Sequence, residues 1–108
     1  MTPEQFVKIF YTEKQDQFDN YLNKHQDTYV SNLINQLDPD EKEMTILREI
    51  IDTILTDTYY TFLLGIDGAA NIGGVQQLYK LFDPNKNELT GSGEIEAFAY
   101  EYFHGDKS

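Results

Sequence analysis

Side chains that could serve as nucleophiles or general bases are scarce along this sequence. The chain has two histidines, His25 and His104, and no cysteine. Neither histidine has a nucleophile close to it in the sequence, and the serines lack the motif context that activates a hydroxyl. We therefore expect no enzymatic activity. The histidines are expected at the surface or at a helix end, where a cation suits the helix dipole.

Oxygen-bearing side chains in residues 83–94, DPNKNELTGSGE, follow the spacing of a calcium-binding EF-hand loop. Ligand positions 1, 3, 5 and 12 of such a loop are occupied by Asp83, Asn85, Asn87 and Glu94. At the sixth position Glu88 replaces the glycine that allows the sharp turn, and the sequence contains no second loop. Calcium binding no tighter than about millimolar is therefore only the alternative prediction, and no cofactor is expected.

Two structures compete for residues 75–90. In the first, residues 78–83 and 88–90 form a β-hairpin with its turn at residues 84–87, PNKN, because proline and asparagine favour turns. In the second, an entering helix makes the segment a degenerate EF-hand-like helix–loop–helix, since apolar residues recur at helical spacing. Those residues are Val75, Leu78, Tyr79 and Phe82. The hairpin is our prediction, and the helix–loop–helix is the alternative.

The chain must fold around a long helix within residues 38–68. Asp38 at the N-cap, Pro39 at the first helical position and Glu41 at the third predict its start. The apolar residues that then recur at helical spacing are Leu47, Ile50, Ile51, Ile54, Leu55, Phe62 and Leu63. Ile46 and Tyr59 widen this stripe, so more than one neighbour must cover it. Ile54 lies in the middle, and Ile54→Ala is predicted to cost roughly 2–5 kcal/mol.

The long helix ends in the turn GIDG, which contains Asp67. Glycine can supply the left-handed stop, at Gly65 or Gly68. Because aspartate commonly bonds the backbone of its own turn, we expect a structural role for Asp67 rather than a binding role.

Three further helices are predicted on either side of the long one. The first begins at Thr2, with Gln5 completing a capping box, and runs to about residue 23. Asp27 is expected to cap a short second helix. The closing helix has the stripe Ile95, Phe98, Ala99, Tyr102 and Phe103, with Gly105 as its stop and residues 106–108 as a frayed tail.

Together these elements predict a mostly helical α+β fold in a single domain over residues 1–108. It comprises three N-terminal helices, a small β-hairpin and a C-terminal helix. The alternative is an all-α fold with the degenerate EF-hand-like helix–loop–helix.

The charge balance restricts the partners that the chain can bind. It carries 19 acidic and 8 basic residues, for a net charge of −11. Nucleic acids and anionic membranes attract basic surfaces, so we expect neither, whereas a basic protein partner would be attracted. The N-terminus lacks the pattern of a signal peptide, and no apolar run reaches the ~18 residues of a membrane span. A cytoplasmic location is expected, and the oligomeric state is left open.

The layout of residues 46–104 resembles that of small acidic cytoplasmic proteins of bacterial toxin–immunity systems and their uncharacterised relatives. The resemblance rests on a long helix ending LLGIDG, a turn-bearing segment LYKLFDPNKNEL and a closing aromatic helix EIEAFAYEYF. It implies a protein that binds and blocks one partner without catalysis. No functional residue can be carried over from it.

Acidic residues of the C-terminal segment form the candidate partner patch. These residues are Asp83, Glu88, Glu94, Glu96 and Glu101, with Tyr100 beside them. Tyrosine commonly anchors protein interfaces, so an exposed Tyr100 among carboxylates could bind a basic partner.

Overall fold

Four helices account for the regular secondary structure of residues 1–105, the part of the chain that the computed structural model describes. They are α1 (Pro3–Leu22), α2 (Tyr29–Leu37), α3 (Glu41–Ile66) and α4 (Glu94–Phe103). The helix predicted from Thr2 to about residue 23 is thus confirmed as one continuous helix. The frayed tail predicted for residues 106–108 lies outside the described residues.

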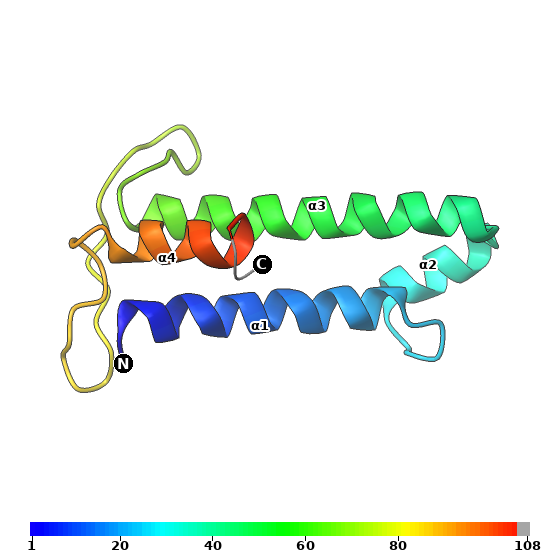
Figure 1. The fold of residues 1–108 in the computed structure, drawn as a ribbon, viewed down its shortest axis with the longest axis horizontal. Coiled ribbons are helices and arrows are strands. Elements are labelled where there is room, and N and C mark those ends of the chain that lie inside the picture. The colour runs from blue at the N-terminus through cyan, green and yellow to red at the C-terminus, as the bar shows by residue number, and fades with distance from the viewer. Residues whose placement is uncertain (106–108) are drawn as a thin grey trace.

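The two long helices run antiparallel along the 47 Å long axis of the molecule (Figure 1). The short helix α4 packs against both α1 and α3 at one end, whereas α2 packs on α1 at the other end. The apolar core therefore lies where α1, α3 and α4 meet. Its buried members are Val7, Leu63, Leu89, Ile95, Ala99 and Phe103.

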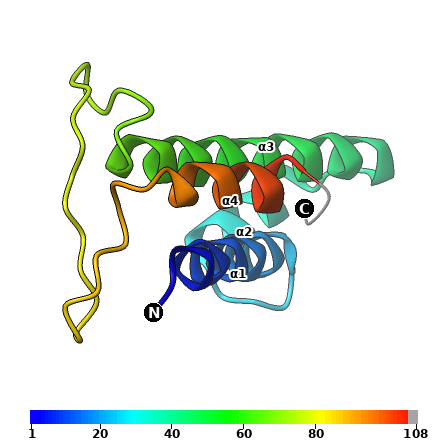
Figure 2. The same ribbon diagram turned by 60° about the vertical axis from the view of Figure 1, so that its left-hand side comes forward.

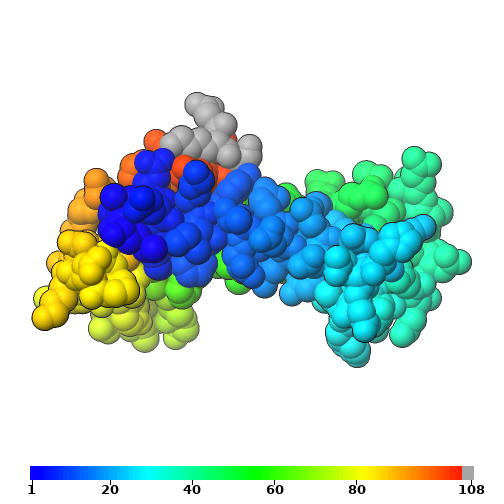
Figure 3. All heavy atoms as spheres, turned by 90° about the horizontal axis from the view of Figure 1, so that it is seen from below, coloured from blue at the N-terminus to red at the C-terminus, as the bar shows by residue number. Residues whose placement is uncertain are grey.

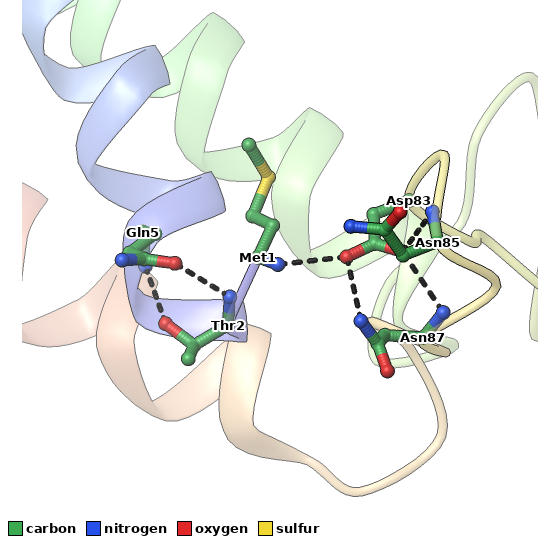
Figure 4. A network of polar contacts seen from close by, with 6 residues as sticks. All are labelled: Met1, Thr2, Gln5, Asp83, Asn85 and Asn87. Atoms are coloured by element: carbon green, nitrogen blue, oxygen red, sulfur yellow. Dashed lines mark hydrogen bonds and ion pairs between the residues drawn. The ribbon is translucent and has the colours of Figure 1, made fainter.

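The first three helices each begin after a residue whose side chain accepts a hydrogen bond from a backbone N–H group of the first turn. At α1, Thr2 and Gln5 form the predicted capping box, shown in Figure 4. The predicted start of α3 is wrong by two residues, because its N-cap is Asp40. Asp38 instead ends α2 in a left-handed conformation, with φ of 50°. Both Asp38 and Asp40 are followed three residues later by a glutamate, which is the spacing of a capping box. Asp38 is not available to start α3, because it is the C-cap of α2.

The α2 helix also starts one residue away from its predicted cap. Its N-cap is Thr28, which forms a capping box with Ser31, whereas Asp27 accepts a bond from the Asn32 amide side chain.

The predicted β-hairpin, and with it the α+β class, is wrong. Between α3 and α4 the described chain forms isolated antiparallel bridges and no sheet. Two backbone bonds do cross the turn, from Leu89 N–H to the Leu81 carbonyl and from Asp83 N–H to the Asn87 carbonyl. The pairing ends beyond them, because Leu81 N–H donates to the Thr90 hydroxyl, which in turn donates to the Tyr79 carbonyl. The turn at residues 84–85 does form where predicted. Figure 2 shows this long loop crossing the end of the bundle from α3 to α1.

The alternative is right in its all-α class but wrong in its EF-hand-like helix–loop–helix. Residues 75–82, the predicted entering helix, are not helical. In Figure 3 the loop between α3 and α4 lies against the N-terminal end of α1.

Ile54 is not in the core. Its side chain is 57% exposed, whereas Leu63 on the same helix is 0% exposed. The ten residues of α4 cover only one end of the 26-residue α3, and α2 packs on α1 rather than along α3. The core position on which the predicted cost of Ile54→Ala depended is therefore wrong, and a smaller loss is expected, since an exposed side chain leaves no cavity when truncated.

Polar contacts join α1 to α3 beyond the apolar core. Lys14 is buried and its ammonium lies 2.5 Å from a carboxylate oxygen of Asp52. The Tyr59 hydroxyl donates to Gln17 at 2.6 Å. Lys14 and Gln17 of α1 thus point toward α3 and have partners there, which is what a buried amine or amide requires.

Candidate protein-binding surfaces

Asp83, the first residue of the predicted patch, is buried and hydrogen-bonded within the protein. Its side chain is 2% exposed. One carboxylate oxygen accepts from the backbone N–H groups of Asn85 and Asn87, both at 2.9 Å. The other accepts from the Asn87 side-chain amide at 3.0 Å and from the α-amino group of Met1 at 2.7 Å (Figure 4). Asp83 therefore organises the turn and fixes it to the start of α1.

The same contacts determine the charge state of Asp83. The hydrogen bond from the α-amino group, followed by those from Asn87, holds the pKa of the Asp83 carboxyl well below its usual range. Asp83 is thus a carboxylate without free acceptor positions for a partner's cation.

The residues of the alternative metal site make other hydrogen bonds in this structure. Asn87 donates its side-chain amide N–H to a carboxylate oxygen of Asp83. Glu94 begins α4 and accepts from the Ser92 hydroxyl. Within residues 1–105, no group of three or more His, Cys, Asp or Glu side chains is placed to hold a metal ion.

Asp67 has a structural role, as predicted, but with different partners. Its two carboxylate oxygens accept from the backbone N–H groups of Gly91 and Glu96, each at 3.1 Å. The N-cap of α4 is Gly93, which has no side chain to accept these bonds. Asp67, the residue that ends α3, therefore caps α4 from across the loop.

The remaining patch residues lie mainly on one helix. Glu94, Glu96, Tyr100 and Glu101 are all exposed on α4, and we call them the acidic face. Tyr100 is 57% exposed. Glu88 is also exposed, but it belongs to the loop before α4. The structure thus brings four of the six predicted residues onto one short helix.

The acidic face adjoins two further rings. His104 follows α4 as its C-cap, the helix-end position predicted for it, and its ring meets Tyr60 edge-on at 4.5 Å. Burial, followed by the charges of Glu96 and Tyr100, raises the pKa of the Tyr60 hydroxyl. This aromatic margin gives the acidic face apolar as well as charged contact area.

His25 lies in the exposed loop between α1 and α2. Together with Lys24 and Arg48 it lines a cavity of about 530 Å³ at that end of the molecule. Asp38 lines the same cavity. None of these residues was predicted as a site.

A second surface, missed from the sequence, lies on α3. Ile46, Ile50 and Ile54 recur every four residues and point away from the core, so we call them the isoleucine row. They are 51%, 47% and 57% exposed. The sequence did contain a signal for this surface, because the apolar stripe of α3 is too wide to be covered by the helices that pack against it.

Shallow hollows follow the outward side of α3. Leu37 and Ile46 line one of about 260 Å³, the isoleucine row lines one of about 360 Å³, and Phe62 and Ile72 line one of about 460 Å³. Each hollow also contains one carboxylate, which is Glu43, Glu49 and Asp57 in turn. This side of α3 is therefore apolar with acids at its margins.

No family model matches the chain, and neither a curated protein nor a solved structure matches it significantly. Within the described residues, no helix combines the length and the apolar character needed to cross a membrane. Function is therefore inferred from the surfaces described above.

Proposed function

We propose that this chain is a non-enzymatic protein of the immunity type, which binds a basic protein in the cytoplasm and blocks it. The observation that carries the proposal is the acidic face of α4, where three exposed carboxylates share a short helix with a tyrosine that is more than half exposed. Tyrosine anchors and complementary charge are both typical of protein interfaces. The net charge of −11 would draw a basic partner from a distance.

The acidic face should act mainly on the rate of association. Exposed charges steer encounters between proteins, and salt screens this steering over about 8–10 Å. Blocking would then follow from covering the partner's surface, because no chemistry by this chain is required.

The test begins with capture of a partner from the native host and its purification. Association rates are then measured at low and high salt for the natural chain, Glu96→Lys and Glu101→Lys. We expect each reversal to slow association by roughly threefold to tenfold at low salt and to weaken the salt dependence. Asp16→Lys, a reversal at an exposed position of α1, is the matched control and should have a smaller effect.

Unchanged association rates and unchanged salt dependence in both α4 variants would show that the acidic face is not the interface.

A further inference from the structure

We infer that the outward side of α3 is a docking surface for a partner segment in which apolar side chains are flanked by lysine or arginine. This inference rests on the proposed function, because it names a surface and a partner chemistry for the same binding activity. The isoleucine row would be the centre of the contact, and the carboxylates of the neighbouring hollows would be its margin.

The apolar part of this surface is continuous from Leu37 to Ile54. The hollow beside Leu37 and the hollow beside Ile54 share Ile46, so they adjoin along the helix. From Ile46 to Ile54 the helix rises by about 12 Å, which is the length of about two helical turns. Isolated exposed apolar residues need no explanation, but an aligned row of this length is typical of an interaction site.

The molecule also exposes more surface than a globular protein of the same mass. A globular protein of 12.5 kDa exposes about 6,200 Å², whereas this chain exposes 7197 Å². The radius of gyration of 16.3 Å likewise exceeds the ~13 Å expected for a compact domain of this length. The elongated shape therefore leaves more surface uncovered than a compact fold of the same mass would.

The charges at the margin select the chemistry of the partner. Glu43, Glu49 and Asp57 each lie in one of the three hollows, and no lysine or arginine lines any of them. Complementary potentials favour a partner with basic residues beside its apolar ones. An acidic or anionic partner would place like charges together.

A second copy of this chain is the wrong occupant for the same reason. An antiparallel pair of α3 helices centred on Ile50 would match Ile46 with Ile54, but it would also place Glu43 opposite Asp57. A parallel two-fold pair would place each acid opposite itself. Each copy also carries a net charge of −11, so two copies would repel each other at long range as well as in contact.

The test uses a synthetic amphipathic helical peptide with leucines on one side and lysines at its flanks. A second peptide carries glutamates in place of the lysines. Binding of each labelled peptide to the full chain is measured by fluorescence anisotropy. We expect the lysine peptide to bind, the glutamate peptide to bind at least about tenfold more weakly, and Ile50→Gln to weaken the lysine peptide by about tenfold or more. Ile9→Gln, at a half-exposed isoleucine of α1, is the matched control and should bind the lysine peptide like the natural chain.

Several outcomes would overturn the inference. They are no binding of the lysine peptide, equal binding of the two peptides, and equal binding by Ile50→Gln and the natural chain. A dimer in sedimentation that Ile50→Gln dissociates would also overturn it, because the occupant would then be a second copy. Unfolding curves of Ile50→Gln should match those of the natural chain, since the side chain is exposed.

Failure of this inference differs from failure of the proposed function. If the α4 reversals slow the natural partner while Ile50→Gln changes neither peptide nor partner binding, the proposed function stands and the docking surface on α3 is wrong. If neither set of variants affects the natural partner, both are wrong.

Discussion

Two aspartates show how hydrogen-bond donors decide the role of an acidic residue. Asp67 and Asp83 both stand next to turn-forming residues, and sequence reasoning placed one in the fold and the other in a partner patch. In the structure both accept backbone N–H groups, and Asp83 also accepts the α-amino group of Met1. That last donor comes from 82 positions away, so local turn chemistry could not reveal it.

The lowered pKa of Asp83 predicts a loss of stability in acid. A carboxyl whose pKa is lower in the folded chain than in the unfolded chain stabilises the fold above the unfolded value of about 3.9. This contribution declines as the pH falls below that value toward the folded pKa. Asp83→Asn should therefore lower the urea midpoint at about pH 7, and the difference from the natural chain should shrink at about pH 3.

Glu88→Gln is the matched control for Asp83→Asn, because Glu88 is an exposed acid of the same loop. It should leave the midpoint nearly unchanged at both pH values. An Asp83→Asn difference that does not change with pH would contradict the assigned role of the carboxylate.

At the scale of the elements, periodicity predicted the helices well but not their neighbours. The single helix α1, the long α3 and the closing α4 all lie close to their predicted ranges. The sequence could not show that the hairpin would fail. The Leu81 N–H donates to the Thr90 side chain instead of a backbone carbonyl, and this contact depends on the tertiary structure. Ile54 was assigned to the core because a helical repeat shows which residues are apolar, whereas the length of α4 decides which of them are covered.

The start of α4 should depend on Asp67. Asp67→Ala removes the acceptor for the Gly91 and Glu96 N–H groups, and we expect it to cost about 1–2 kcal/mol in the free energy of unfolding. Asp67→Asn keeps one acceptor oxygen and should cost less. Urea unfolding followed by circular dichroism measures both. Equal stability of the alanine variant and the natural chain would mean that α4 does not need this cap.

The two sides of α3 should respond oppositely to truncation. Leu63→Ala removes a fully buried side chain and should cost roughly 2–5 kcal/mol. Ile54→Ala should change the free energy of unfolding by less than about 1 kcal/mol, because the side chain is exposed and alanine has the higher helix propensity. Both variants are compared in the same urea titration. Similar losses for both would place the isoleucine row in the core.

For the whole molecule, composition predicted the electrostatic character but not the shape. The net charge of −11 was available from the sequence, as was the expectation of a basic partner. The elongated form and the position of the uncovered surface were not, because they follow from where α2 and α4 pack. The negative charge of the candidate site and its residues on α4 could thus be predicted from the sequence. The exposure of the isoleucine row could not, because it depends on the tertiary structure.

We infer that a partner covers the outward side of α3, with the isoleucine row at the centre of the contact. Hydrogen–deuterium exchange of the full chain, with and without the lysine-flanked peptide, tests this directly. Binding should slow exchange in residues 41–58 and leave residues 3–22 of α1 unchanged, because occupied surfaces open less often. Slowed exchange in α1 or α4, with none in residues 41–58, would contradict the claim.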